Sequence, residues 1–195
     1  MKLRPIMLLL AVSLGTAALF AAQDPAEAKE ARITDIIVTH NSGNLLVYAT
    51  LVGAFTKEVE ESMVSGTPTT FTYHLRLMKS GSFWRDQEVT SLTVRQTVTY
   101  ELLQDEFRFE RGGGADRLSR STKSFQEVKK WMGGLEGIKV VPYQALGKEE
   151  LYYIQIRAEI RSIELAFPLN YLLFFVSFFN FDTPWADSPY FRVGR

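Results

Sequence analysis

The 195-residue sequence has no cysteine, only two histidines and no excess of either charge. Without cysteine the chain can form no disulfide, no Cys-ligated zinc site and no thiol nucleophile. Lysine and arginine number 22, and aspartate and glutamate also number 22, so the formal net charge is zero. Because nucleic acids are bound by a concentrated excess of basic residues, this balance argues against a nucleic-acid partner.

The sequence also lacks an N-terminal apolar run long enough to cross a membrane comfortably. The run from Ile6 to Phe20 has 15 residues, whereas a spanning helix needs about 17–25. A basic stretch precedes this run, and the small residues Ala26 and Ala28 follow it, which is the order found in a secretory signal peptide. We therefore predict that residues 1–28 are a signal peptide cleaved after Ala28, and that the mature chain acts in the periplasm or at the cell exterior. An uncleaved anchor helix is the alternative.

The rest of the chain, residues 29–195, is rich in segments where apolar and polar residues alternate, as in half-buried strands. Two short helices are predicted, one over 57–65 after the cap Thr56 and one through Met132 that starts with a capping box at Ser124. Strands are expected over 33–40, 45–51, 69–77, 89–100, 106–110 and 152–161. In the last of these, the outward-facing positions are predicted to be Tyr153, Gln155, Arg157, Glu159 and Arg161.

This pattern predicts a mainly β fold, namely an antiparallel two-layer β-sandwich with two or three short helices. A single curved sheet covered by the helices is the alternative. No internal repeat and no Pro/Ser-rich linker divides residues 29–195, so one domain is expected.

Aromatic residues gather in the C-terminal segment 167–191, which holds ten of the 25 in the chain. Between positions 169 and 181 the polar residues fall within an arc of about 80° on a helix, and this spacing predicts a short helix that starts after Pro168, although the Phe and Tyr content favours a strand. A helix of this length would span about 20 Å and would not cross a bilayer. The segment either fills the open end of the sandwich or exposes an apolar docking surface. The candidate interaction surface consists of Phe174, Phe175, Phe178, Phe179 and Trp185.

Residues with obvious chemistry are few. His40 and His74 have no second histidine at ligand spacing, so we predict no metal site and expect His74 to be a structural residue on the polar face of a strand. The sequence has no Gly-x-Ser-x-Gly motif, and the triple glycine 112–114 lacks the Lys-Ser/Thr of a phosphate loop. The trio Trp84-Arg85-Asp86 is expected to lock a loop. We therefore predict no catalytic residue and no cofactor.

Short motifs follow one another along the mature chain: Gly53-Ala54-Phe55, Ser65-Gly66-Thr67-Pro68, Trp84-Arg85-Asp86, Val98-Thr99-Tyr100-Glu101-Leu102-Leu103, Ser124-Phe125-Gln126-Glu127-Val128, Leu151-Tyr152-Tyr153 and Phe167-Pro168-Leu169. In this order they resemble exported proteins of Gram-negative bacteria grouped as domain of unknown function family 4390. The resemblance covers about residues 33–191. It implies a location in the cell envelope and assigns no activity, substrate or catalytic residue.

Together these observations predict a non-catalytic binding or adaptor domain of the envelope. Its partner would be an envelope protein or a membrane surface. One alternative is a periplasmic carrier that holds a hydrophobic ligand between its sheets. A less favoured one is a periplasmic hydrolase in which folding gathers His74 with an acid and a serine.

Overall fold

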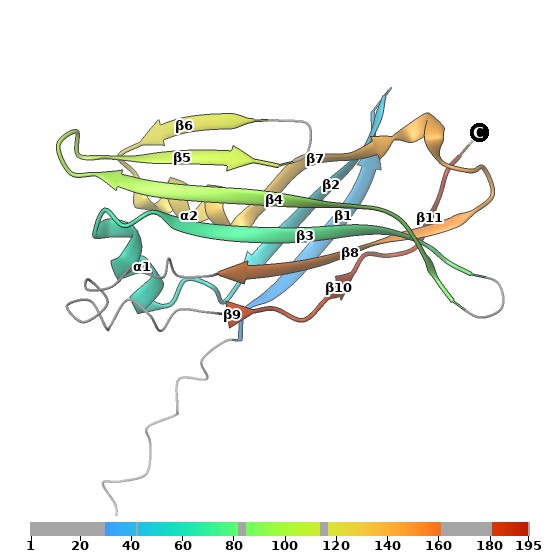
Figure 1. Cartoon of the computed structure of the whole chain (residues 1–195), viewed down its shortest axis with the longest axis horizontal. Helices are drawn as coiled ribbons and strands as arrows, with labels where there is room; N and C mark the ends of the chain where they lie inside the picture. Colours follow the sequence, from blue (N-terminus) through green and yellow to red (C-terminus); the bar gives the residue numbers. More distant parts are fainter. Residues whose placement is uncertain (1–29, 42, 82–84, 114–116, 161–180, 195) are drawn as a thin grey trace, which may run out of the picture.

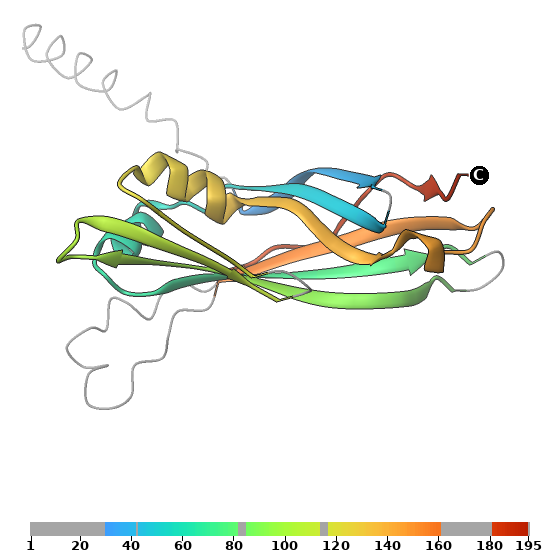
Figure 2. The same ribbon diagram turned by 90° about the horizontal axis from the view of Figure 1, so that it is seen from above.

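The computed structural model describes residues 30–41, 43–81, 85–113, 117–160 and 181–194. In this part of the chain two antiparallel sheets pack face to face (Figures 1 and 2). The predicted mainly β, two-layer architecture is confirmed, and the sheets do not close into a barrel.

The smaller sheet has three strands in the order β1-β2-β7. These are β1 (Arg32–His40), β2 (Asn44–Val52) and β7 (Gly134–Pro142). β1 and β2 form the predicted hairpin. In the turn between them, the side-chain oxygen of Asn41 accepts hydrogen bonds from the backbone N–H groups of Gly43 and Asn44.

The larger sheet has five long strands in the order β8-β3-β4-β5-β6 (Figure 1). Two-residue strands extend it beyond β8. The five are β3 (Thr69–Lys79), β4 (Gln87–Glu101), β5 (Glu106–Gly112), β6 (Leu118–Thr122) and β8 (Leu151–Ile160).

The free edge of β8 is covered by the last described segment of the chain. Its three short strands, β9 (Phe181–Asp182), β10 (Ala186–Asp187) and β11 (Phe191–Arg192), each pair with β8. Unpaired sheet edges invite association with other chains, so this segment protects β8. It also brings Trp185 beside the outer face of the larger sheet.

Both predicted helices form. α1 (Lys57–Val64) begins at Thr56, whose hydroxyl accepts the N–H of Val59, and α2 (Phe125–Gly133) begins at Ser124, whose hydroxyl accepts the N–H of Glu127. The second half of the predicted capping box does not form, because the N–H of Ser124 donates to the hydroxyl of Thr122, which itself donates to Glu127. A 3₁₀ turn, η1 (Tyr143–Ala145), follows β7. α2 runs directly into β7 and lies in the same layer as the smaller sheet (Figure 2).

The core lies between the two layers and consists mainly of alternate residues of β2, β3, β4 and β8. Tyr73 is fully buried and donates a hydrogen bond to the backbone oxygen of Met132 in α2. Burial raises the pKa of Tyr73 well above its ordinary value. The largest fully buried side chains include Phe71, Tyr73, Leu75, Leu77, Phe109, Met132 and Leu135.

Three features of the described chain differ from the sequence predictions. β6 and β7 were not predicted, and α2 gives way to β7 with no intervening loop. Tyr153 and Glu159 lie on the outward face of β8 as expected, but both are buried.

Other predictions fall on residues that the structure does not describe. The signal peptide over 1–28 and the helix over 169–181 fall largely in such segments, as does Trp84. Among the described residues no helix has both the length and the apolarity that a membrane span requires.

Candidate functional site

Of the five residues predicted to form an interaction surface, only Trp185 lies in the described part of the chain. Phe174, Phe175, Phe178 and Phe179 all lie outside it, so their grouping stays a prediction. Trp185 is half-buried between β9 and β10.

The indole ring of Trp185 contacts two arginines from neighbouring strands. The guanidinium carbon of Arg76, on β3, lies 4.2 Å from the ring centroid, and that of Arg157, on β8, lies 5.3 Å from it. Both distances are typical of cation–π contacts. Trp185 therefore belongs to a polar face of the sheet, where it holds two cationic side chains close together.

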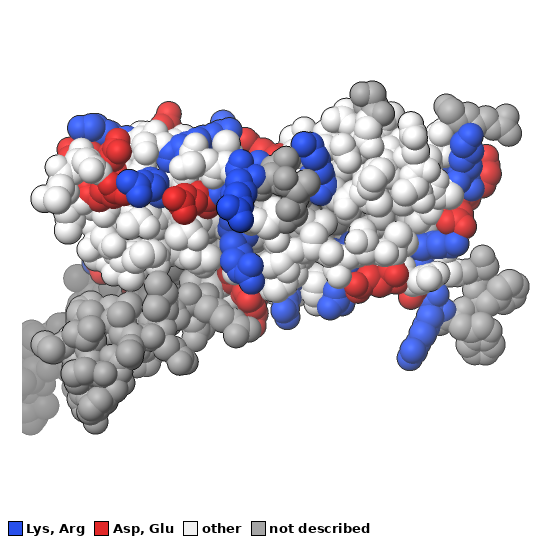
Figure 3. Space-filling model, turned by 45° about the horizontal axis from the view of Figure 1, so that its top comes forward, with Lys and Arg blue, Asp and Glu red and all other residues white. Residues whose placement is uncertain are grey.

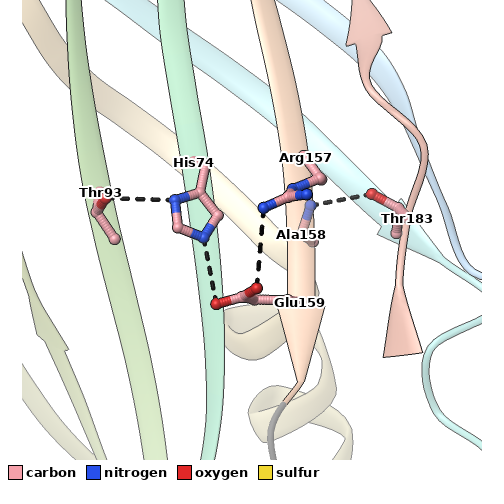
Figure 4. A network of polar contacts seen from close by, with 6 residues as sticks. All are labelled: His74, Thr93, Arg157, Ala158, Glu159 and Thr183. Atoms are coloured by element: carbon pink, nitrogen blue, oxygen red, sulfur yellow. Dashed lines mark hydrogen bonds and ion pairs between the residues drawn. The ribbon is translucent and has the colours of Figure 1, made fainter. Parts of the chain in front are cut away.

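Next to Arg157, three side chains from three adjacent strands meet (Figure 4). Nε2 of His74 lies 3.3 Å from a carboxylate oxygen of Glu159, and Nδ1 of His74 lies 3.4 Å from the hydroxyl of Thr93. The other carboxylate oxygen of Glu159 lies 3.9 Å from Arg157. The Glu159 side chain is only 10% exposed, so its charge is held by these partners and not by water.

The sheet register explains why these side chains meet. His74 pairs with Thr93 on one side and with Arg157 on the other, so the three point from the same face. Glu159 is two residues from Arg157 and returns to that face. A hollow of about 290 Å³ opens above them, lined by His74, Leu75, Arg76, Ser91, Leu92, Thr93, Arg157 and Trp185.

A hydroxyl, an imidazole and a carboxylate in line are the group types of a hydrolytic triad. Here Thr93 lies inside the regular strand β4, where it pairs with His74 of β3, and not at a turn or a helix N-terminus that would present a group of N–H donors. An oxyanion hole needs free donors, which backbone N–H groups most often supply. The arrangement is better suited to holding an ion pair than to acyl transfer.

A second polar cluster fixes the β3–β4 connection. Asp86 accepts hydrogen bonds from the backbone N–H of Gly81 and from the hydroxyl of Tyr153. The hydrogen bond from the Gly81 N–H, and to a lesser extent that from the Tyr153 hydroxyl, lowers the pKa of Asp86. Burial of the Tyr153 side chain, together with its hydrogen bond to Asp86, raises the pKa of Tyr153 to about 12. Asp86 thus performs the loop-locking role expected of the Trp84-Arg85-Asp86 trio.

The end of the molecule that carries α1 exposes large apolar side chains. Leu102 and Leu103, in the turn between β4 and β5, are 70% and 100% exposed. Val64, at the end of α1, is 44% exposed, and the neighbouring Gly66 lies close to Leu102. We call Val64, Leu102 and Leu103 the apolar tip.

The apolar tip was not singled out from the sequence. Leu102 and Leu103 directly continue the alternating segment that forms β4, so they are typical of a strand end. Their exposure follows from where the strand stops: Glu101 pairs with Glu106, and the four residues between them form the turn. Turns usually contain Gly, Asn, Asp or Pro, and two leucines there serve no evident structural purpose.

The smaller sheet also exposes apolar side chains. Ile37 and Tyr48 pair across β1 and β2 and are 58% and 36% exposed. Beside them is a mostly apolar hollow of about 330 Å³ that reaches Lys129 and Lys130 of α2.

Charged side chains of both signs are interspersed on the face drawn in Figure 3, with no large field of one sign. Among the described residues, no three His, Asp or Glu side chains gather closely enough to hold a metal ion. His40 stacks on Tyr143, with ring centroids 4.1 Å apart.

The fold therefore defines an open, antiparallel two-layer β protein with two capped helices. The family model described as Domain of unknown function (DUF4390) matches residues 28–188, and the chain belongs to this family. No curated protein and no solved structure matches the chain.

Proposed function

We propose that this protein is an exported, non-catalytic adaptor domain of the bacterial envelope that docks on a protein partner through its apolar tip. Export is supported by the basic and apolar N-terminal segment followed by small residues. The observation that carries the docking proposal is the exposure of Leu102 and Leu103 on a hairpin turn.

Exposed leucines at a turn are costly in solution and useful at an interface. Burying apolar area contributes about 25 cal/mol per Å², so two leucines can anchor a contact when a partner provides a pocket. The turn is supported by its own strands, because the tilted rings of Tyr100 and Phe107 pack with their centroids 4.7 Å apart and the hydroxyl of Tyr100 donates to Asp105. A braced turn loses little conformational freedom on binding.

The charges beside the tip favour a protein over a membrane. The hairpin carries Glu101, Asp105 and Glu106, of which the first pairs with Arg108 and the second lies 3.9 Å from Lys123. Anionic lipids would repel this carboxylate-rich turn. A partner surface with an apolar pocket bordered by Lys or Arg would complement it.

The two alternatives have less support. The interior between the sheets is filled by the core side chains, and the two hollows described above open on outer surfaces, which does not favour a ligand carried inside the sandwich. A hydrolase would require Thr93 or Ser91 as the nucleophile, and both lie inside the regular strand β4, paired with β3, and not at a turn or helix N-terminus that could supply an oxyanion hole.

The test is chemical cross-linking in living cells with a tagged full-length protein, followed by mass spectrometry of the adducts. We expect one dominant envelope protein with the unmodified chain. The double variant Leu102→Ser, Leu103→Ser should lose that adduct and keep its thermal unfolding midpoint, because both side chains are already exposed.

The matched control is Val89→Ser, which removes another exposed apolar residue, 42% exposed, from the far end of β4. This variant should keep the adduct. Retention of the adduct in the double serine variant, or adducts to lipid alone, would refute docking of a protein through the tip.

A further inference from the structure

We propose that the hollow bordered by Arg76, Arg157 and Trp185 binds an oxyanion, either a carboxylate or a phosphate group. The inference goes beyond the proposed adaptor function and does not depend on the apolar tip, which belongs to a different part of the molecule. It rests on the positions of the two guanidinium groups and on their hydrogen-bond donors that have no acceptor within the described part of the protein.

The two arginines have spare hydrogen-bond donors. Among the described residues neither guanidinium makes a hydrogen bond; each has one long ion pair, Arg76 with Glu88 at 3.5 Å and Arg157 with Glu159 at 3.9 Å. Nε of Arg157 is buried and has no hydrogen-bond partner. A guanidinium presents five donors, so both arginines keep N–H groups that a ligand with acceptor oxygens can use.

Trp185 keeps the two cations together. Its ring contacts both guanidiniums, which would otherwise repel each other and separate into solvent. Two planar guanidinium forks that face one hollow match the paired oxygens of a carboxylate or a phosphate. The hydroxyls of Ser91 and Thr93 line the same hollow and can add hydrogen bonds.

The neighbouring carboxylates limit the affinity but do not occupy the site. The carboxylate of Glu159 lies near His74 and one terminal nitrogen of Arg157. The carboxylate of Glu88 lies near the Nε atom of Arg76. These two carboxylates balance the two arginines, so a ligand is held by directed hydrogen bonds more than by net charge. The volume of about 290 Å³ suits a single acidic group with a few further atoms.

The experiment is a titration of the full chain, labelled with ¹⁵N, with inorganic phosphate and separately with glutarate. The Trp185 indole signal, assigned with a Trp185→Phe variant, and the Arg76 and Arg157 Nε–H signals report binding. We expect these signals to shift saturably with at least one of the two anions. Saturation by phosphate alone identifies a phosphate site, and saturation by glutarate alone identifies a carboxylate site.

Variants separate a built site from general attraction to positive charge. Arg157→Lys keeps the charge but loses the planar fork, so it should weaken binding by about tenfold. Arg95→Gln removes an exposed arginine of β4 that does not line the hollow, and should leave affinity unchanged. Glu88→Gln should tighten binding severalfold, because it removes a repelling carboxylate beside Arg76.

The proposal fails if neither anion gives a saturable shift. It also fails if Arg95→Gln weakens binding as much as Arg157→Lys does, or if Arg157→Lys binds like the unmodified chain. A thermal unfolding midpoint within error of the unmodified protein for each variant ensures that a loss of binding is not a loss of fold.

Discussion

At the scale of single residues, Gly113 has a backbone conformation and a close neighbour that leave no room for a Cβ atom. Its φ of +100° is unfavourable for an L-residue, and a Cβ there would lie 2.0 Å from the backbone oxygen of Thr93. Within the triple glycine, position 113 therefore requires glycine, because the backbone of Thr93 lies too close for any side chain.

We predict that Gly113→Ala lowers the free energy of unfolding by about 1–3 kcal/mol, because the strand must move away from Thr93. Urea unfolding followed by circular dichroism measures this. The adjacent Gly112→Ala is the control, since a Cβ at Gly112 meets nothing within 4 Å. Equal effects of the two substitutions would contradict the account.

The hydrogen bonds at Asp86 predict a specific pH dependence. They lower the pKa of Asp86 in the folded state, so their stabilisation is complete above the unfolded pKa of about 3.9 and is lost as the pH falls through the folded value. Asp86→Asn should therefore be less stable than the unmodified protein at pH 7, and the difference should shrink below about pH 4.

The partner of Asp86 should respond at the opposite end of the pH scale. The pKa of Tyr153 is raised to about 12, so its contribution persists below the unfolded value of about 10 and is lost as the pH rises toward 12. Tyr153→Phe should remove this alkaline loss of stability. Thermal unfolding midpoints across pH 3–11 test both variants, and parallel profiles for all three proteins would refute the assignment.

At the scale of elements, the C-terminal segment acts as a continuous cover for the edge of β8. Between its short strands, side-chain hydroxyls take the place of backbone carbonyls as hydrogen-bond acceptors for β8. The hydroxyl of Thr183 accepts a hydrogen bond from the N–H of Ala158, and the hydroxyl of Ser188 accepts one from the N–H of Ile154. Thr183 and Ser188 are both buried, so no water can substitute freely.

We predict that Thr183→Ala destabilises the protein by about 1–3 kcal/mol, because the buried N–H of Ala158 loses its acceptor. Thr183→Ser keeps the hydroxyl and should recover most of this loss. Hydrogen exchange of the Ala158 amide, measured by NMR, should accelerate in Thr183→Ala and stay slow in Thr183→Ser. Equally slow exchange in both variants would be inconsistent with this role.

Regular elements could be predicted from the sequence where one rule governed them. Alternation identified β3, β4 and β8, and capping residues placed α1 after Thr56 and α2 after Ser124. β7 was not predicted, because its two glycines and the bulges in its pairing with β2 interrupt the alternation of apolar and polar residues. The short strands β9 to β11 have only two residues each, too few for any periodic signal.

At the scale of the whole molecule, the candidate sites depend on register and packing that one sequence does not reveal. His74 and Glu159 were both predicted on outward faces, but only the β3–β8 register places them 3.3 Å apart. Glu159 is buried although it faces outward. The role of Trp185 likewise required knowing that Arg76 and Arg157 lie on neighbouring strands.

The two-layer fold also places three distinct surface features on different parts of the molecule. The outer face of the larger sheet carries the arginine-lined hollow, the smaller sheet exposes Ile37 and Tyr48, and the apolar tip projects at the end that carries α1 (Figure 1). Among the residues that the structure describes, only the tip combines nearly complete exposure of large apolar side chains with a turn that does not require them.

The most direct test of the central claim is a positional scan with a photo-cross-linking amino acid in living cells. The probe is placed in turn at positions 64, 102 and 103 of the tip, at 37 and 48 of the smaller sheet, and at 89 on β4. Adaptor docking through the tip predicts the same single adduct from 102 and 103, a weaker one from 64, and none from 37, 48 or 89. Adducts from 37 and 48 instead, or equal labelling at every position, would contradict it.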